Sequence, residues 1–107
     1  MDSKEVQLIR EAAKKVYLDF TGHAKKQLYE RKIKVELVKK AVLEGKVIDR
    51  QEDKGEDVRI LFQEASEEKP RFCVVVTSTI PPRVVTAFWF DEECWKYDSK
   101  NNIWRRK

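Results

Sequence analysis

The feature that most constrains the fold is a change of hydrophobic period at Gly45. Before this residue, apolar side chains recur every three or four positions, which is the spacing of amphipathic helices. After it, they alternate or run together in short β-branched and aromatic segments, which is typical of strands. The 107 residues suit one domain. The order of elements therefore predicts an α+β domain, with N-terminal helices packed on one face of a curled antiparallel sheet of four or more strands.

Three helices are predicted before Gly45, and the first spans about residues 2–18. Asp2 or Ser3 is placed to cap this helix. Gly22 interrupts the pattern, and residues 23–32 resume it as a shorter helix. The apolar side chains of the first helix recur at spacings of three and four, and they are Val6, Ile9, Ala13, Val16 and Phe20.

The third helix is expected between Lys34 and Gly45. Glycine is the residue type expected just past a helix C-terminus, so Gly45 marks its end. If Lys34 occupies the N-cap position, Ile33 is placed to pack on Val38 as a hydrophobic staple.

Four strands and a tail are expected after Gly45. In the second strand, apolar residues at every other position, the last of them Phe62, alternate with Arg59, Leu61 and Gln63. We expect these three residues to face water or a partner. The Trp-rich tail, residues 91–107, is expected to form either a hairpin or an ordered arm. The four strands are predicted at residues 46–50, 57–64, 71–79 and 83–90.

Composition and cysteine content narrow the kinds of protein to consider. Charged residues make up 39% of the chain, the net charge is +4, and no apolar run has the length of a membrane span or the pattern of a signal peptide. We therefore expect a soluble, cytoplasmic protein. Cys73 and Cys94 are 21 positions apart without a CxxC motif, and only one His could join them. We expect two buried free thiols, with no disulfide, metal or cofactor.

A set of motifs occurs in a fixed order between Phe20 and Phe90. A His-Ala pair starts a helix, an Arg follows eight residues after the His, a second helix ends in Gly, and a closing strand carries Val-Thr; the residues are His23, Ala24, Arg31, Gly45, Val85 and Thr86. This order resembles a family of short bacterial and archaeal domains of unknown function, placed in the RelE/ParE toxin-like superfamily. The chain departs from it at Lys34, where the family usually has Ser, Thr or Asp.

The resemblance implies a RelE-like core over residues 20–90. Within a single domain, residues 1–107, the helix over residues 2–18 and the tail over residues 91–107 would be additions to that core. Better-studied members of the superfamily are toxins of toxin–antitoxin pairs; some cut mRNA and others poison DNA gyrase. The resemblance thus implies a metal-independent ribonuclease toxin with an antitoxin-like protein partner. The alternative is a non-enzymatic module that binds protein or nucleic acid.

His23, the only histidine, leads the candidate catalytic residues. Metal-independent RNA cleavage needs a base for the 2′-OH proton, an acid for the leaving oxygen and a cation for the charged phosphorane. His23, Gln27 and Arg31 lie at i, i+4 and i+8, so on a helix they form one stripe. Arg83, at a strand start, completes the catalytic set as a phosphate contact. Alternatively, His23 hydrogen-bonds a backbone group or Asp19, Arg31 pairs with an acidic residue of the sheet, or His23 binds a ligand without chemistry.

Positive charge is concentrated in residues 22–40, which carry seven Lys or Arg against two Glu. A basic stripe on adjacent helices would release counterions from the backbone of RNA or DNA, and RNA is the partner that the resemblance implies. The alternatives are a solvated helix surface and a site for an acidic protein. The candidate nucleic-acid contacts are Lys25, Lys26, Lys32, Lys34 and Arg59.

Aromatic side chains gather toward the C-terminus. Most are expected to pack in the core or within the tail, whereas exposed ones would stack on bases or form a groove for an antitoxin-like helix. The set comprises Phe88, Trp89, Phe90, Trp95, Tyr97 and Trp104.

Overall fold

A computed structural model describes residues 3–15, 18–52 and 57–107. It confirms the α+β class and the three helices, which are α1 (Lys4–Lys14), α2 (Gly22–Arg31) and α3 (Val35–Glu44). The strands are β1 (Asp19–Phe20), β2 (Val47–Gln51), β3 (Arg59–Gln63), β4 (Phe72–Thr77), β5 (Arg83–Trp89), β6 (Trp95–Asp98) and β7 (Ile103–Arg106).

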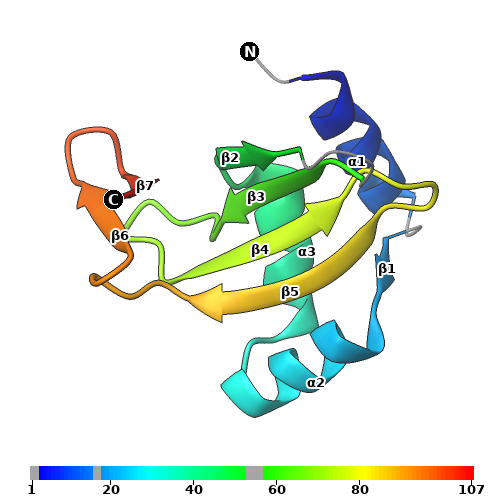
Figure 1. Cartoon of the computed structure of the whole chain (residues 1–107), viewed down its shortest axis with the longest axis horizontal. Coiled ribbons are helices and arrows are strands. Elements are labelled where there is room, and N and C mark those ends of the chain that lie inside the picture. Colours follow the sequence, from blue (N-terminus) through cyan, green and yellow to red (C-terminus); the bar gives the residue numbers. More distant parts are fainter. Residues whose placement is uncertain (1–2, 16–17, 53–56) are drawn as a thin grey trace.

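The strands form a five-stranded sheet with the order β1-β5-β4-β3-β2 and a separate β6-β7 hairpin (Figure 1). Strands β2 to β5 pair antiparallel, as predicted. The sheet is nevertheless mixed, because β1 pairs parallel with the start of β5. Within residues 91–107, β6 and β7 pair antiparallel as a hairpin.

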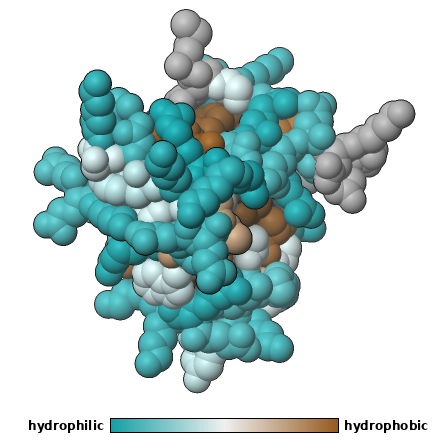
Figure 2. Space-filling view, turned by 60° about the vertical axis from the view of Figure 1, so that its left-hand side comes forward, coloured by the Kyte–Doolittle hydropathy of each residue, from teal (hydrophilic) through white to brown (hydrophobic). Residues whose placement is uncertain are grey.

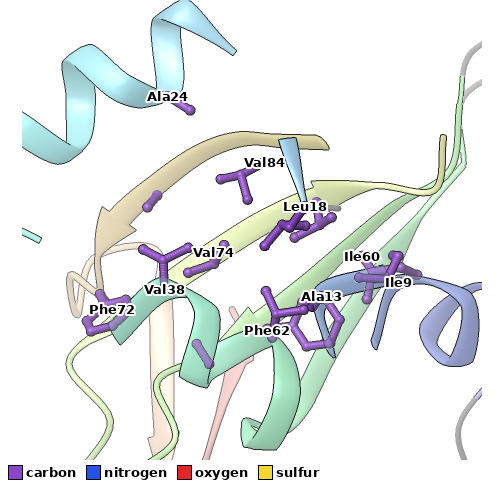
Figure 3. Packing of buried hydrophobic residues seen from close by; sticks show 14 of the residues in the cluster. Ile9, Ala13, Leu18, Ala24, Val38, Ile60, Phe62, Phe72, Val74 and Val84 are labelled. Carbon is purple, nitrogen blue, oxygen red and sulfur yellow. The ribbon is translucent and has the colours of Figure 1, made fainter. Parts of the chain in front are cut away.

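Polar side chains cover most of the face drawn in Figure 2, as expected of a chain with 39% charged residues. The main core lies between one face of the sheet and all three helices. Figure 3 shows Ile9 and Ala13 of α1, Ala24 of α2 and Val38 of α3 turned toward the strands. The helices therefore share one face of the sheet, as the sequence predicted.

Helix α1 is shorter than predicted. Ser3 is its N-cap, since its hydroxyl accepts a hydrogen bond from the Val6 N–H at 3.3 Å, while Asp2, the other candidate cap, lies outside the described residues. Val16, assigned to this helix by its spacing, also lies outside them. Phe20 belongs to β1, so the spacing that included it in the helix was misleading.

The connection between α2 and α3 is tight and involves a strained residue. Lys32 has φ 56°, in the left-handed region, and the Ile33 N–H donates to the Leu28 carbonyl at 3.0 Å, which closes α2. Lys34 is the N-cap of α3 but provides no side-chain cap bond. Ile33 and Val38 are both buried in the main core, as the predicted staple requires.

A second core lies on the opposite face of the sheet, under the hairpin, and it corrects the prediction for β3. Leu61 and Gln63 were expected to face water or a partner, but they are only 2% and 1% exposed. Trp95 and Trp104 of the hairpin cover this face. The Gln63 amide donates to the Asn102 carbonyl at 2.8 Å and accepts from the Trp104 N–H at 3.0 Å.

Candidate functional site

Helix α2 is fastened along the outer edge of β5. β1 pairs only with Arg83 and Val84, so the rest of this edge needs other partners. The Arg31 guanidinium donates from Nη1 to the Ala87 carbonyl. In the other direction, the Trp89 indole N–H donates to the Arg31 carbonyl at 3.0 Å. Arg31 therefore binds the sheet through a backbone carbonyl, and none of the described acidic side chains pairs with it.

His23 lies on the same stripe but is exposed to solvent. Its Nε2 is 2.7 Å from the Gln27 side-chain nitrogen, and the Thr86 hydroxyl donates to the Gln27 carbonyl oxygen. A chain of hydrogen bonds thus runs from β5 through Gln27 to the imidazole and fixes the ring. This arrangement holds His23 at the surface, where its other nitrogen can meet a ligand.

Arg83 and Arg59 lie elsewhere on the sheet. Both are directly opposite Thr77 of β4, one on each side, so they share the face that carries the second core. Both are exposed, and Arg83 pairs with Asp19 at 3.5 Å. Within the described ranges, no hydrogen bond or ion pair links Arg83 to the α2 stripe. The predicted catalytic set therefore divides between two places.

The predicted basic contacts on the helices are exposed. Lys25 and Lys26 lie on α2, and Lys26 makes a long ion pair with Glu30 at 3.9 Å. Lys32 and Lys34 lie in the connection to α3. In the part of the chain that the structure describes, the ammonium groups of Lys25, Lys32 and Lys34 have no ion-pair partner.

A cleft of about 750 Å³ opens beside this connection, and sequence reasoning missed two of its residues. Arg71 belongs to no predicted site, and Trp89 belongs to the aromatic set that is expected mostly to be buried. The Trp89 side chain is 41% exposed at the end of β5, whereas Trp95 and Trp104 are buried as expected. The cleft is lined by Lys32, Ile33, Lys34, Glu36, Leu37, Arg71, Phe72 and Trp89.

Arg71 is held in the cleft wall by Glu64. Its Nη2 and Nε donate to the two carboxylate oxygens at 2.6 and 3.1 Å, and its backbone N–H donates at 2.9 Å. Burial alone would raise the pKa of Glu64, but these hydrogen bonds outweigh it and lower the pKa below its usual value. Glu64 is therefore a buried anion that fixes the guanidinium, which stays largely exposed.

The cysteines differ from the prediction of two buried thiols. Both are free, but only Cys73 is buried, and its burial strongly raises the pKa of its thiol. Cys94 is exposed because it lies in the turn before β6. Across residues 3–15, 18–52 and 57–107, no cluster of three or more His, Cys, Asp or Glu side chains could hold a metal ion. Among the described helices, none is long and apolar enough to cross a membrane.

Comparison with known families gives a match to a family model. Residues 20–89 match the family described as Domain of unknown function (DUF4258), which spans β1 to β5 with α2 and α3. Neither a curated protein nor a solved structure matches the chain. The matched region contains the α2 stripe and all the residues that line the cleft, whereas α1 and the hairpin lie outside it.

Proposed function

The chain belongs to the family described as Domain of unknown function (DUF4258), and on this premise we propose that it is a RelE-like domain that binds RNA. The observation that carries the proposal is the unpaired charge of the α2–α3 segment. Lys25, Lys32 and Lys34 are exposed and lack ion-pair partners among the described residues. Ammonium groups of this kind bind phosphates and release their counterions.

The arrangement of the elements supports the RelE/ParE-like part of the proposal. Helices α2 and α3 precede four antiparallel strands and cover one face of them, which is the order and layering that we associate with that superfamily. The basic segment connects these two helices, so it belongs to the family region and not to the additions outside it.

RNA binding can be tested with a fluorescein-labelled 12-nucleotide single strand and anisotropy at 50 and 200 mM salt. We expect wild type to bind and to weaken as salt rises, since the contacts are to phosphates. The double variant Lys32→Ala and Lys34→Ala should bind at least about 5-fold more weakly. A matched control, Lys4→Ala with Lys14→Ala, removes the same charge from α1. Absence of wild-type binding at 50 mM salt, or an equal loss in the control, would refute the proposal.

A second candidate is a metal-independent ribonuclease toxin, and the fixed, exposed ring of His23 favours it. The neutral imidazole would exchange its hydrogen bond from Gln27 for one from the 2′-OH and take that proton at Nε2. The 2′-oxygen would then attack the adjacent phosphorus, and the 5′-oxygen would leave with a proton from water. Lys26, three residues along α2, neighbours His23 and could stabilise the phosphorane. Arg31 would position the helix, because its guanidinium is engaged by Ala87. Such a toxin would also need an antitoxin-like protein partner.

Cleavage is tested by incubating labelled mRNA in EDTA with wild type, His23→Ala and the surface control Gln7→Ala. We expect wild type and the control to give the same products and His23→Ala to lose at least about 100-fold in rate. Equal and negligible cleavage by all three proteins would remove the ribonuclease candidate, and the RNA-binding proposal would then stand on its own test.

A further inference from the structure

Two adjoining clefts meet at Arg71 and Trp89, and we call them together the Trp89 groove. The first is the cleft of about 750 Å³ beside the α2–α3 connection. The second, about 480 Å³, continues toward the hairpin and is lined by Lys69, Pro70, Arg71, Trp89, Phe90, Glu92 and Trp104. The groove therefore runs from a basic turn, past an exposed indole, to a second aromatic cluster.

The Trp89 ring is rigid although it is exposed. Its Nε1 donates to the Arg31 carbonyl at 3.0 Å, and its ring meets Phe72 edge to face, with the centroids 5.9 Å apart and an interplanar angle of 86°. The Arg71 guanidinium carbon lies 6.0 Å from the ring centroid. A ring fixed at two points loses little freedom when a flat ligand stacks on it, so Trp89 is a preorganised stacking surface.

The charges of the groove are uneven along its length. At the hairpin end Lys69 pairs with Glu92 at 3.1 Å, and Arg71 pairs with Glu64. At the other end, Lys32 and Lys34 have no ion-pair partner in the described part of the chain, and Glu36 is the acidic residue nearby. Unpaired positive charge thus lies at one end of the groove, beside the indole.

The backbone of Lys32 adds a separate argument. Its φ of 56° is in the left-handed region, where glycine is unstrained and a lysine is not. The position caps α2, where glycine is the commonest residue. Strain at a position that a simpler residue would relieve is a reason to look for a function of the side chain. The ammonium group that this residue places at the groove provides one.

We propose that the Trp89 groove binds unpaired bases of single-stranded RNA, with a base stacked on Trp89 and the adjoining phosphates at Lys32 and Lys34. This inference rests on the proposed function, since it takes RNA as the ligand. It adds that the groove is the binding site and that the RNA is single-stranded there. Bases in a duplex are stacked on one another, so only a single strand can present a base face to an indole.

The test compares a labelled U12 strand with a labelled RNA duplex of the same length, at one salt concentration. We expect Trp89→Ala to bind U12 about 5- to 150-fold more weakly, which is the loss expected when one base no longer stacks. Its affinity for the duplex should change by less than about 2-fold. Trp89→Phe keeps a ring and should lose less. The control Tyr29→Ala removes an aromatic that is 86% exposed on α2 but does not line the groove, and its affinity should match wild type.

If Trp89→Ala unfolds, the variant Lys32→Gly still tests whether the groove binds RNA. Relief of the left-handed strain should raise the Tm, while loss of the ammonium group should weaken U12 binding at least about 3-fold. A loss of structure cannot produce this combination. If wild type binds U12 and Trp89→Ala or Lys32→Gly binds it equally well, the groove is not the site, although the proposed function stands. If wild type binds no RNA, the proposed function itself fails.

Discussion

Arg31 and His23 lie on one stripe of α2, yet their side chains do different things. The Arg31 guanidinium is half-buried and supplies a donor to the Ala87 carbonyl on an otherwise incompletely paired strand edge. The His23 ring is exposed and, among the described residues, is hydrogen-bonded by Gln27 alone. The same helical period therefore places one residue to stabilise the fold and leaves the other at the surface.

This difference predicts opposite effects of two alanine substitutions. Arg31→Ala should lower the free energy of unfolding by about 1–3 kcal/mol, because it leaves the Ala87 carbonyl without its donor. His23→Ala should change it by less than about 0.5 kcal/mol, as is usual for an exposed side chain. Urea denaturation followed by circular dichroism measures both. An equal loss in the two variants would mean that His23 is also structural.

Glu64 predicts how stability depends on pH. Its pKa is lower in the folded chain than the ordinary value of about 4.3, so the pair with Arg71 stabilises the fold above that value and is lost as the pH falls through the folded-state pKa. Glu64→Gln should cost about 1 kcal/mol at pH 7, and its difference from wild type should shrink toward pH 3. Denaturation at several pH values tests this, with the exposed Glu44→Gln as control. A difference that persists at pH 3 would assign the loss to packing.

At the α3–β2 junction, Gly45 lies very close to the backbone of β3 and of α3. A Cβ added there would lie 2.1 Å from the Gln63 carbonyl oxygen and 2.5 Å from that of Ala41. At Gly22, the first residue of α2, a Cβ would meet nothing within 4 Å. The two glycines therefore have different reasons to be present.

Gly45→Ala should destabilise the protein by about 2–3 kcal/mol, because the helix end and β3 must move apart. Gly22→Ala should instead stabilise it by about 0.5 kcal/mol, since alanine restricts the unfolded chain and favours the helix. The urea midpoint of each variant gives the comparison. A neutral Gly45→Ala would show that the junction can relax without loss.

The helices and strands could be predicted from the sequence where the pattern that indicates them is local. Apolar spacing located α2, α3 and strands β2 to β5 to within a few residues, because each pattern depends on neighbouring positions only. β1 has two residues, too few for a pattern. It exists because the Asp19 and Thr21 N–H groups donate to the carbonyls of Pro82 and Val84, at 2.9 and 3.0 Å. Such a pairing depends on a segment more than 60 residues away.

At the scale of the whole molecule, the candidate site could likewise be predicted only where it depends on neighbouring residues. The stripe from His23 to Arg31 follows from helical spacing, but the Ala87 carbonyl that engages Arg31 is 56 residues away and carries no side-chain signal. The Trp89 groove combines four separate segments, so no single window of sequence contains it. The burial of Gln63 likewise depends on the hairpin that covers it.

The β6-β7 hairpin lies outside the residues that match the family. Its contribution to the stability of the whole fold can be measured. Trp104 is 3% exposed, stacks on Phe90 with the centroids 4.6 Å apart, and donates from Nε1 to the Pro70 carbonyl at 2.7 Å. The hairpin also satisfies the buried Gln63 amide. These contacts make the second core part of the same structure as the sheet, and not a separate arm laid over it.

Trp104→Ala should therefore lower the free energy of unfolding by about 3–5 kcal/mol, as is typical when a buried tryptophan is removed and its partners lose their contacts. Ile80→Ala, at a side chain that is 99% exposed, should change it by less than about 0.5 kcal/mol. Wild-type unfolding followed by tryptophan fluorescence and by far-UV circular dichroism should give coincident transitions, because hairpin and sheet unfold together. If the fluorescence transition came first, with the circular dichroism signal of the sheet intact, the hairpin would be an independent unit and the sheet would be stable with that face uncovered.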